Sequence, residues 1–151
     1  MGRVITLIRE PASRVYGIAY EIKRENAEKT FEYLNYREKC GYTMHKVQFY
    51  ASFNLSKDQP HDAAEAGTSL LDAICYFANE DNFYFSKEPD LVKQAQLIAQ
   101  AVGPSGSNRE YLFNFCQALK SLLVGKLNEL ENGNDKHIFE LENLVRSINN
   151  S

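Results

Sequence analysis

The feature that most constrains the fold is a change of hydrophobic period near the middle of this 151-residue chain. Up to residue 78, most segments either are rich in β-branched residues or alternate apolar residues with polar or small ones, as is typical of β-strands. Beyond residue 90, they recur every three or four residues, which is the pattern of amphipathic helices. Strands followed by helices predict an α+β fold, in which helices cover part of a largely antiparallel sheet that can be open or closed.

Four segments of the first half predict strands: 3–8, 14–22, 46–53 and 69–78. The periodicity of the last of them ("SLLDAICYFA") fits either a helix or a strand, but Ile, Cys, Tyr and Phe toward its end favour a buried strand. Between the last two strands, residues 54–68 ("NLSKDQPHDAAEAGT") are polar and contain Pro60 and Gly67. We therefore expect a long, mobile hairpin connection there.

Four segments predict helices: 26–36, 89–104, 108–130 and 135–148. Three of them begin at a residue that can cap a first turn, namely Asn26, Asn108 and Asp135. The second places Leu91, Ala95, Ile98, Ala99 and Val102 on one face, and Gly103-Pro104 ends it. The fourth carries an apolar stripe of Ile138, Leu141, Leu144, Val145 and Ile148. We expect a single domain over residues 1–151, because no repeat or boundary interrupts the pattern.

Charge and cysteine content exclude several classes of function. The net charge of −3 and the scattered Lys and Arg residues give no nucleic-acid or membrane-binding patch. Three cysteines without a CxxC spacing indicate free thiols in a reducing, cytoplasmic compartment rather than a disulfide framework. Three histidines without HExxH spacing, and without a Cys at ligand spacing, give no reason to expect a metal site.

One short segment and one cysteine are candidates for binding or catalysis. The string "GPSGSN" (103–108) runs into a helix start, where backbone N–H groups attract carboxylate or phosphate, although a plain linker between helices is the better interpretation. Cys40 is interpreted as an ordinary turn thiol, because no electropositive niche surrounds it in the sequence.

Glu38 lies between Arg37 and Lys39, two cations that favour a hydrated surface carboxylate. A general base needs shielding from such charges, and the tyrosines nearby suggest partial burial. For Glu38 to act as a base, we expect both cations to point away from it.

Four strings identify a resemblance: "GRVITL" (2–7), "RVYGIAYEI" (14–22), "EYLNYREKCGY" (32–42) and "GPSGSNREYLFN" (103–114). They follow the same order as in the ChaC family of glutathione-specific gamma-glutamylcyclotransferases. The resemblance runs from Gly2 to the final helix. It implies a closed or barrel-like mixed sheet flanked by helices, and conversion of glutathione to 5-oxoproline and cysteinylglycine without metal or cofactor. It also implies that Glu38 is the catalytic residue and that Tyr111 and Asn108 contact the substrate.

The chain departs from the family pattern at two places. Residues 86–89 read "SKEP" where the family has Gly-Pro, which is a small change in a loop. The family's first strand and its Tyr-Gly-Ser-Leu turn, which holds the substrate, have no counterpart in these residues. We therefore expect a truncated form with an exposed sheet edge that favours self-association, and little or no activity from this chain alone. The alternatives are a non-catalytic interaction or regulatory protein, and a cyclotransferase acting on gamma-glutamyl amino acids.

Overall fold

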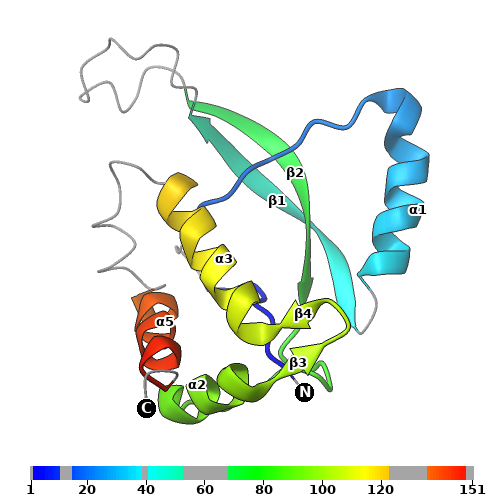
Figure 1. The fold of residues 1–151 in the computed structure, drawn as a ribbon. Helices are drawn as coiled ribbons and strands as arrows, with labels where there is room; N and C mark the ends of the chain where they lie inside the picture. Colours follow the sequence, from blue (N-terminus) through cyan, green and yellow to red (C-terminus); the bar gives the residue numbers. More distant parts are fainter. Residues whose placement is uncertain (1, 11–14, 39–40, 53–67, 123–135, 149–151) are drawn as a thin grey trace, which may run out of the picture. The chain divides into compact units, whose positions relative to one another are not determined.

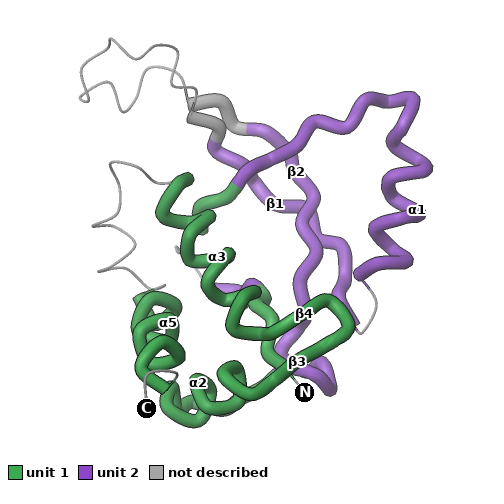
Figure 2. The backbone as a smooth tube through the Cα atoms, viewed as in Figure 1, with its two compact units in different colours: residues 1–6, 12–17, 86–151 green, residues 7–11, 18–85 purple. Residues whose placement is uncertain are grey.

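The computed structural model describes residues 2–10, 15–38, 41–52, 68–122 and 136–148. The chain divides into two compact units (Figure 2). Unit 1 contains Met1–Thr6, Ala12–Gly17 and Ser86–Ser151, and unit 2 contains Leu7–Pro11 and Ile18–Phe85. Unit 1 holds the helices of the second half, and unit 2 holds the helix and the long strands of the first half. The prediction of one domain over residues 1–151 stays a prediction.

Unit 1 is built on three described helices, α2 (Leu91–Gln100), α3 (Asn108–Leu122) and α5 (Lys136–Ile148) (Figure 1). Each carries an apolar face, and the three faces meet in one core. The amphipathic spacing of the sequence is the reason, because it removes apolar side chains from water on one side of each helix only. The fully or nearly buried members of this core are Ala95, Ile98, Leu112, Cys116, Ile138, Leu141 and Val145.

Two details of the predicted helices in unit 1 are wrong. Val102 does not continue α2; it lies in strand β3 (Val102–Gly103), which pairs with β4 (Gly106–Ser107), and it is 79% exposed. Asn108 does not cap α3 but is its first residue. Ser107 takes the capping role, since its hydroxyl accepts a hydrogen bond from the N–H of Glu110 at 3.2 Å. The expected cap of α5, Asp135, lies outside the described residues.

The predicted strand 3–8 is wrong as well, because no strand is assigned to residues 2–10. The side chain of Asn108 makes the backbone hydrogen bonds there that a neighbouring strand would otherwise make. The amide of Asn108 accepts a hydrogen bond from the N–H of Arg3 at 2.6 Å and donates one to the carbonyl of Arg3, also at 2.6 Å. Since the backbone of Arg3 is satisfied in this way, the segment needs no partner strand at that point.

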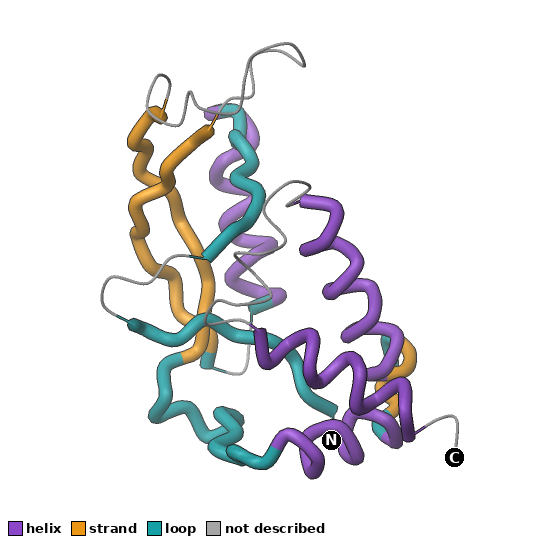
Figure 3. Tube along the Cα trace, turned by 90° about the vertical axis from the view of Figure 1, so that its left-hand side faces the viewer, coloured by secondary structure: helices purple, strands orange, loops and turns teal. Residues whose placement is uncertain are grey.

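Unit 2 is built on an antiparallel hairpin of β1 (Tyr42–Ser52) and β2 (Thr68–Ala78), drawn as two long strands running side by side in Figures 1 and 3. Tyr42 pairs with Ala78 at one end and Ser52 with Thr68 at the other. Both predicted strands are therefore confirmed, and β1 is longer than its predicted range. The predicted mobile connection, 54–68, lies outside the described residues except for Thr68, which is in β2.

The burial expected for β2 is wrong. Ala78 is buried, whereas Leu71 and Ile74 are 46% and 43% exposed. A two-stranded hairpin covers neither of its faces by itself, so its apolar residues stay partly accessible unless another layer packs on them. The predicted strand 14–22 is also wrong over its described part, where Ile18 and Tyr20 are 64% and 81% exposed and no strand is assigned.

The helix of unit 2, α1 (Ala27–Arg37), follows a short 3-10 helix at Arg24–Asn26 (η1). Asn26 occupies the N-cap position as predicted, but its side chain makes no capping hydrogen bond. None of the residues of α1 is buried; the half-buried face includes Ala27, Phe31 and Leu34.

The described residues thus form a mixed fold of helices and sheets. Their sheets are two antiparallel pairs, β1–β2 and β3–β4, and no closed barrel is found among them. Within the part of the chain that the structure describes, no helix has the length and the apolar character needed to cross a membrane.

Candidate active site

Glu38 stands at the C-terminal end of α1, as the residue that caps the helix. Its N–H donates to the carbonyl of Leu34 at 2.7 Å, and its backbone then leaves the helical conformation with ψ at 47°. The side chain is 31% exposed, so the carboxylate is half-buried rather than fully hydrated. This position combines access for a reactant with partial removal from water, which suits proton transfer.

The partial burial of Glu38 that the nearby tyrosines suggest is confirmed, and a second sequence signal also indicates it. Ala27, Phe31 and Leu34 recur at the spacing of one helical face, and continuing that spacing by four residues reaches position 38. The structure gives Glu38 the same intermediate exposure as these three residues. A carboxylate at the end of an otherwise apolar stripe is less hydrated than its charged sequence neighbours suggest.

The expectation that Arg37 points away from Glu38 is wrong. Nε of Arg37 lies 3.9 Å from Oε1 of Glu38, and the Arg37 side chain is 67% exposed. A hydrogen bond from Nη1 to the Tyr33 hydroxyl at 3.5 Å, followed by the nearby Glu38, raises the pKa of Arg37. The guanidinium is thus a permanent but solvated charge beside the carboxylate, and water screens much of its effect. Lys39 lies outside the described residues, as does Cys40.

The turn after β2 packs against Gly41, three residues beyond Glu38. Gly41 has φ at +85°, and a Cβ at this position would collide with the side-chain amide of Asn82. An open depression lies here, lined by Gly41, Asp81, Asn82, Phe83 and Tyr84. Phe83 is 92% exposed and meets the Tyr84 ring edge-on at 5.3 Å, so an aromatic pair borders this depression.

The other two candidate residues lie together in unit 1, whereas Glu38 belongs to unit 2. Tyr111 is in the first turn of α3 and is 40% exposed. Its hydroxyl accepts a hydrogen bond from the N–H of Ile5 at 3.2 Å. Asn108 and Tyr111 therefore hold the backbone of the same N-terminal segment, one at Arg3 and the other at Ile5.

The string "GPSGSN" forms the tight connection between α2 and α3. Gly103 pairs with Gly106 across the turn, and Gly106 has φ at +114°. The N–H of Asn108 donates to the carbonyl of Ala101 at 2.9 Å, which closes the hairpin onto the start of α3. The linker interpretation is thus confirmed.

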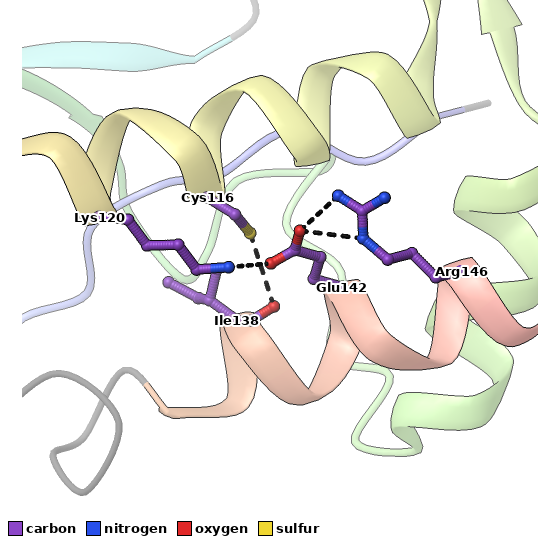
Figure 4. Close-up of polar contacts among 5 residues, drawn as sticks. All are labelled: Cys116, Lys120, Ile138, Glu142 and Arg146. Carbon is purple, nitrogen blue, oxygen red and sulfur yellow. Dashed lines mark hydrogen bonds and ion pairs between the residues drawn. The ribbon is translucent and has the colours of Figure 1, made fainter. Parts of the chain in front are cut away.

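A buried ionic cluster in unit 1 was not foreseen (Figure 4). Glu142 is 5% exposed, yet its carboxylate binds Lys120 Nζ at 2.9 Å and Arg146 Nη2 at 2.7 Å. Burial, and then the neighbouring Glu142, raise the pKa of Cys116 to about 12. Cys116 is therefore an unreactive thiol of the core rather than a nucleophile.

Metal ligation finds no support in the described residues, where no three His, Cys, Asp or Glu side chains are grouped to hold an ion.

Known proteins similar to this chain are cyclotransferases. It is 34% identical to the glutathione-specific gamma-glutamylcyclotransferase of Saccharomyces cerevisiae, over 79% of this chain and 55% of that protein. Gamma-glutamylcyclotransferase 2-3 of Arabidopsis thaliana is 34% identical, over 97% of this chain and 66% of its own length. The human glutathione-specific gamma-glutamylcyclotransferase 1 is 32% identical over 79% of this chain and 49% of its own length. The chain thus spans about half to two thirds of the length of these relatives.

A crystal structure of the yeast gamma-glutamyl cyclotransferase specific to glutathione, with selenomethionine label, matches the fold. Its TM-score is 0.67 at 30% sequence identity, covering 83% of this chain and 56% of that one. The model of one family, described as ChaC-like protein, matches residues 1–148. This match extends over almost the entire chain, so the chain belongs to the ChaC-like protein family.

Proposed function

We propose that this protein is a gamma-glutamylcyclotransferase that cleaves glutathione to 5-oxoproline and cysteinylglycine, as a lyase of glutathione catabolism. The observation that carries the proposal is Glu38, a half-buried carboxylate at the end of an apolar helical face. Membership of the ChaC-like family supports it, as do the names of the relatives described above.

Glu38 acts as both base and acid in the proposed reaction. Its carboxylate takes a proton from the α-ammonium group of the gamma-glutamyl residue, and the freed amine attacks the substrate's own γ-carbonyl carbon. A carbon–nitrogen bond forms and closes the five-membered lactam. The bond from the same carbon to the cysteinyl nitrogen breaks, and Glu38 returns the proton to that nitrogen. The cyclising nitrogen loses a second proton as it becomes the lactam N–H, and this proton also ends on the departing amine, which leaves as the α-ammonium group of cysteinylglycine. Because the nucleophile belongs to the substrate, the protein contributes mainly a bound, attack-ready conformation.

We further propose that Asn108 and Tyr111 contact the substrate. Both Asn108 amide groups are engaged by Arg3 in the structure, so contact through Asn108 requires the amide to exchange Arg3 for a substrate group. Tyr111 presents a half-exposed hydroxyl beside the same segment. We assign to both residues the orientation of the substrate through hydrogen bonds.

The test is to incubate the purified chain with reduced glutathione and to measure 5-oxoproline and cysteinylglycine. Glu38→Gln is expected to lower turnover by at least about a hundredfold, because the amide cannot accept the proton. Glu32→Gln is the matched control, since Glu32 lies in α1 but is exposed. Turnover by the wild type that survives Glu38→Gln would remove Glu38 from the mechanism. Preference for gamma-glutamyl amino acids over glutathione would change the substrate class but keep the reaction.

For the fold, we propose a closed, barrel-like mixed sheet flanked by helices, of which β1 and β2 form part. The support is the apolar character of the described side chains, including Val4, Ile8 and Ile18, which are each more than half exposed. Removing such surface from water gives a driving force for sheet closure. Amide exchange is the test: in a closed sheet, the N–H groups of β1 and β2 that point away from the hairpin would be protected, and fast exchange at all of them would argue against closure.

The same exposed side chains favour a second candidate function, a non-catalytic interaction protein that associates with itself through a sheet edge. Light scattering over a range of protein concentrations tests this candidate, and a concentration-independent monomer would argue against it. We place the protein in the cytoplasm, on the basis of its three cysteines without a CxxC spacing. A fluorescent fusion found in a secretory compartment would contradict that location.

A further inference from the structure

We propose that two contacts to β2 and its following turn clamp the segment that carries Glu38, which makes Tyr76 and Asn82 positioning residues for the reaction. One clamp lies three residues before Glu38 and the other three residues after it. The inference rests on the proposed function for its catalytic consequence, whereas the clamps themselves are geometric.

The first clamp is a hydrogen bond between α1 and β2. The hydroxyl of Tyr76 donates to the side-chain carbonyl of Asn35 at 2.8 Å. Asn35 lies in the last turn of α1, so this bond ties the end of the helix, rather than its middle, to the hairpin. Since none of the residues of α1 is buried, packing alone holds the helix weakly, and a directional bond at its end has more influence on Glu38.

The second clamp is a close packing contact at Gly41. The positive φ of +85° and the approach of the Asn82 amide both require a residue without a Cβ at this position. Asn82 is itself held in place by the turn. Its N–H donates to the carbonyl of Asn79 at 3.0 Å, its carbonyl accepts from the N–H of Phe85 at 2.9 Å, and its side-chain oxygen accepts from the N–H of Tyr84 at 2.8 Å.

Both clamps reach the same short stretch of chain, residues 76–82, which is the end of β2 and the turn that follows it. Glu38 needs this support because it is where the helix ends: its ψ of 47° lies outside the helical range, so the helix does not fix the chain beyond it. A misplacement of about 1 Å at a reacting group can lower a rate by about a hundredfold. Holding the chain on both sides of Glu38 limits such displacement.

The experiment compares three variants with the wild type in steady-state kinetics with glutathione. Tyr76→Phe removes one hydroxyl, and Asn82→Ala removes the packed amide, while Asn82→Asp keeps an acceptor for the N–H of Tyr84 and serves if Asn82→Ala fails to fold. Tyr20→Phe is the control, because Tyr20 lies in the same unit and is 81% exposed. We expect kcat to fall about 10- to 100-fold in the clamp variants with KM within about threefold of wild type, since positioning rather than binding is lost. Added to Glu38→Gln, the clamp substitutions are expected to have no further effect.

A second readout does not depend on activity. Hydrogen exchange at the Glu38 amide, which donates to Leu34, is expected to speed up in Tyr76→Phe and in Asn82→Ala but not in Tyr20→Phe. Unchanged kcat, or a KM that rises as much as kcat falls, would overturn the positioning role. If the wild type shows little or no turnover, the exchange measurement alone decides the clamps. Unchanged exchange at Glu38 in both clamp variants would then reject them.

Discussion

Replacing Glu142 with glutamine is expected to destabilise unit 1 while leaving its shape unchanged. The carboxylate is 5% exposed and accepts three hydrogen bonds, from Lys120 Nζ at 2.9 Å and from Arg146 Nη2 and Nε at 2.7 and 3.1 Å. Charge-assisted bonds contribute about 1.5–3 kcal/mol each when both partners are buried. Here the side chains of Lys120 and Arg146 are 45% and 55% exposed, so both cations regain water when the carboxylate is lost. We therefore expect a total loss of about 2 kcal/mol.

The pH dependence of the stability difference between wild type and Glu142→Gln provides a second, independent test of this prediction. Burial opposes ionisation of Glu142 and is the largest single influence, but hydrogen bonds from Lys120 and Arg146 together outweigh it and lower the pKa of the carboxyl below 4.5. A carboxyl with a lowered pKa stabilises the fold above the pKa it has in the unfolded chain, and this contribution is lost as pH falls through the folded pKa. The difference between wild type and Glu142→Gln should be full above about pH 5 and should shrink below about pH 4.

The assay is urea unfolding followed by circular dichroism at several pH values, together with thermal unfolding. A loss of about 2 kcal/mol corresponds to a Tm lower by about 4–8 °C for a chain of this size. Glu140→Gln makes the same chemical change at an exposed position of α5 and should have almost no effect. The reasoning is refuted if Glu142→Gln stays within about 0.5 kcal/mol of wild type, or if the difference persists undiminished at pH 3.

Four further predictions concern other contacts in unit 1. Asp90→Ala should destabilise the protein by about 1 kcal/mol in thermal unfolding, because the carboxylate caps α2 through the N–H groups of Val92 and Lys93, and Asp90→Asn should restore most of the loss. Cys116, which is 0% exposed and has its pKa raised to about 12, should react with iodoacetamide at pH 8 only as fast as the protein unfolds; faster labelling of the native protein would contradict its burial. Because the pKa of the Cys116 thiol is raised in the folded state, the thiol contributes fully to stability below about pH 9, and this contribution is lost as pH rises further. The free energy of unfolding in urea should therefore fall more between about pH 8 and about pH 10 in wild type than in Cys116→Ala. Asn108→Ala should accelerate amide exchange at Arg3, since both hydrogen bonds from the Asn108 side chain to the Arg3 backbone disappear. Equal exchange rates in wild type and variant would show that these two hydrogen bonds do not hold the N-terminal segment in solution.

The elements that the sequence predicted correctly are those whose own residue pattern is typical of one secondary structure. The stripe of Ile138, Leu141 and Val145 predicts α5 because a helix shows the same face to its neighbours wherever they come from. The alternation around Val47 and Phe49 predicts β1, and the apolar run 69–78 predicts its partner. In α5 and β1 the spacing carries the information, and in 69–78 the residue types do.

The wrong predictions depend on partners that spacing does not reveal. A run such as 3–8 has strand-like residues, but a strand also needs a neighbouring backbone, and here the Asn108 amide satisfies Arg3 instead. Ser107 and Asn108 are equally good capping residues by type, so sequence alone could not say which one caps α3. At the candidate site, the half-burial of Glu38 could be inferred from the stripe of α1, whereas the contact between Gly41 and Asn82 requires the fold.

The half-buried face of α1 has a consequence for insertions and deletions. Each residue of an α-helix turns the chain by about 100°, so removing one residue between Ala27 and Leu34 would rotate that face by the same angle relative to Glu38. The carboxylate would then emerge toward a different side of the helix, although its sequence neighbours remained the same. Changes of seven residues, which are close to two full turns, would nearly restore the original direction. The length of α1 is therefore constrained in steps of whole turns, even though its exposed positions tolerate substitution.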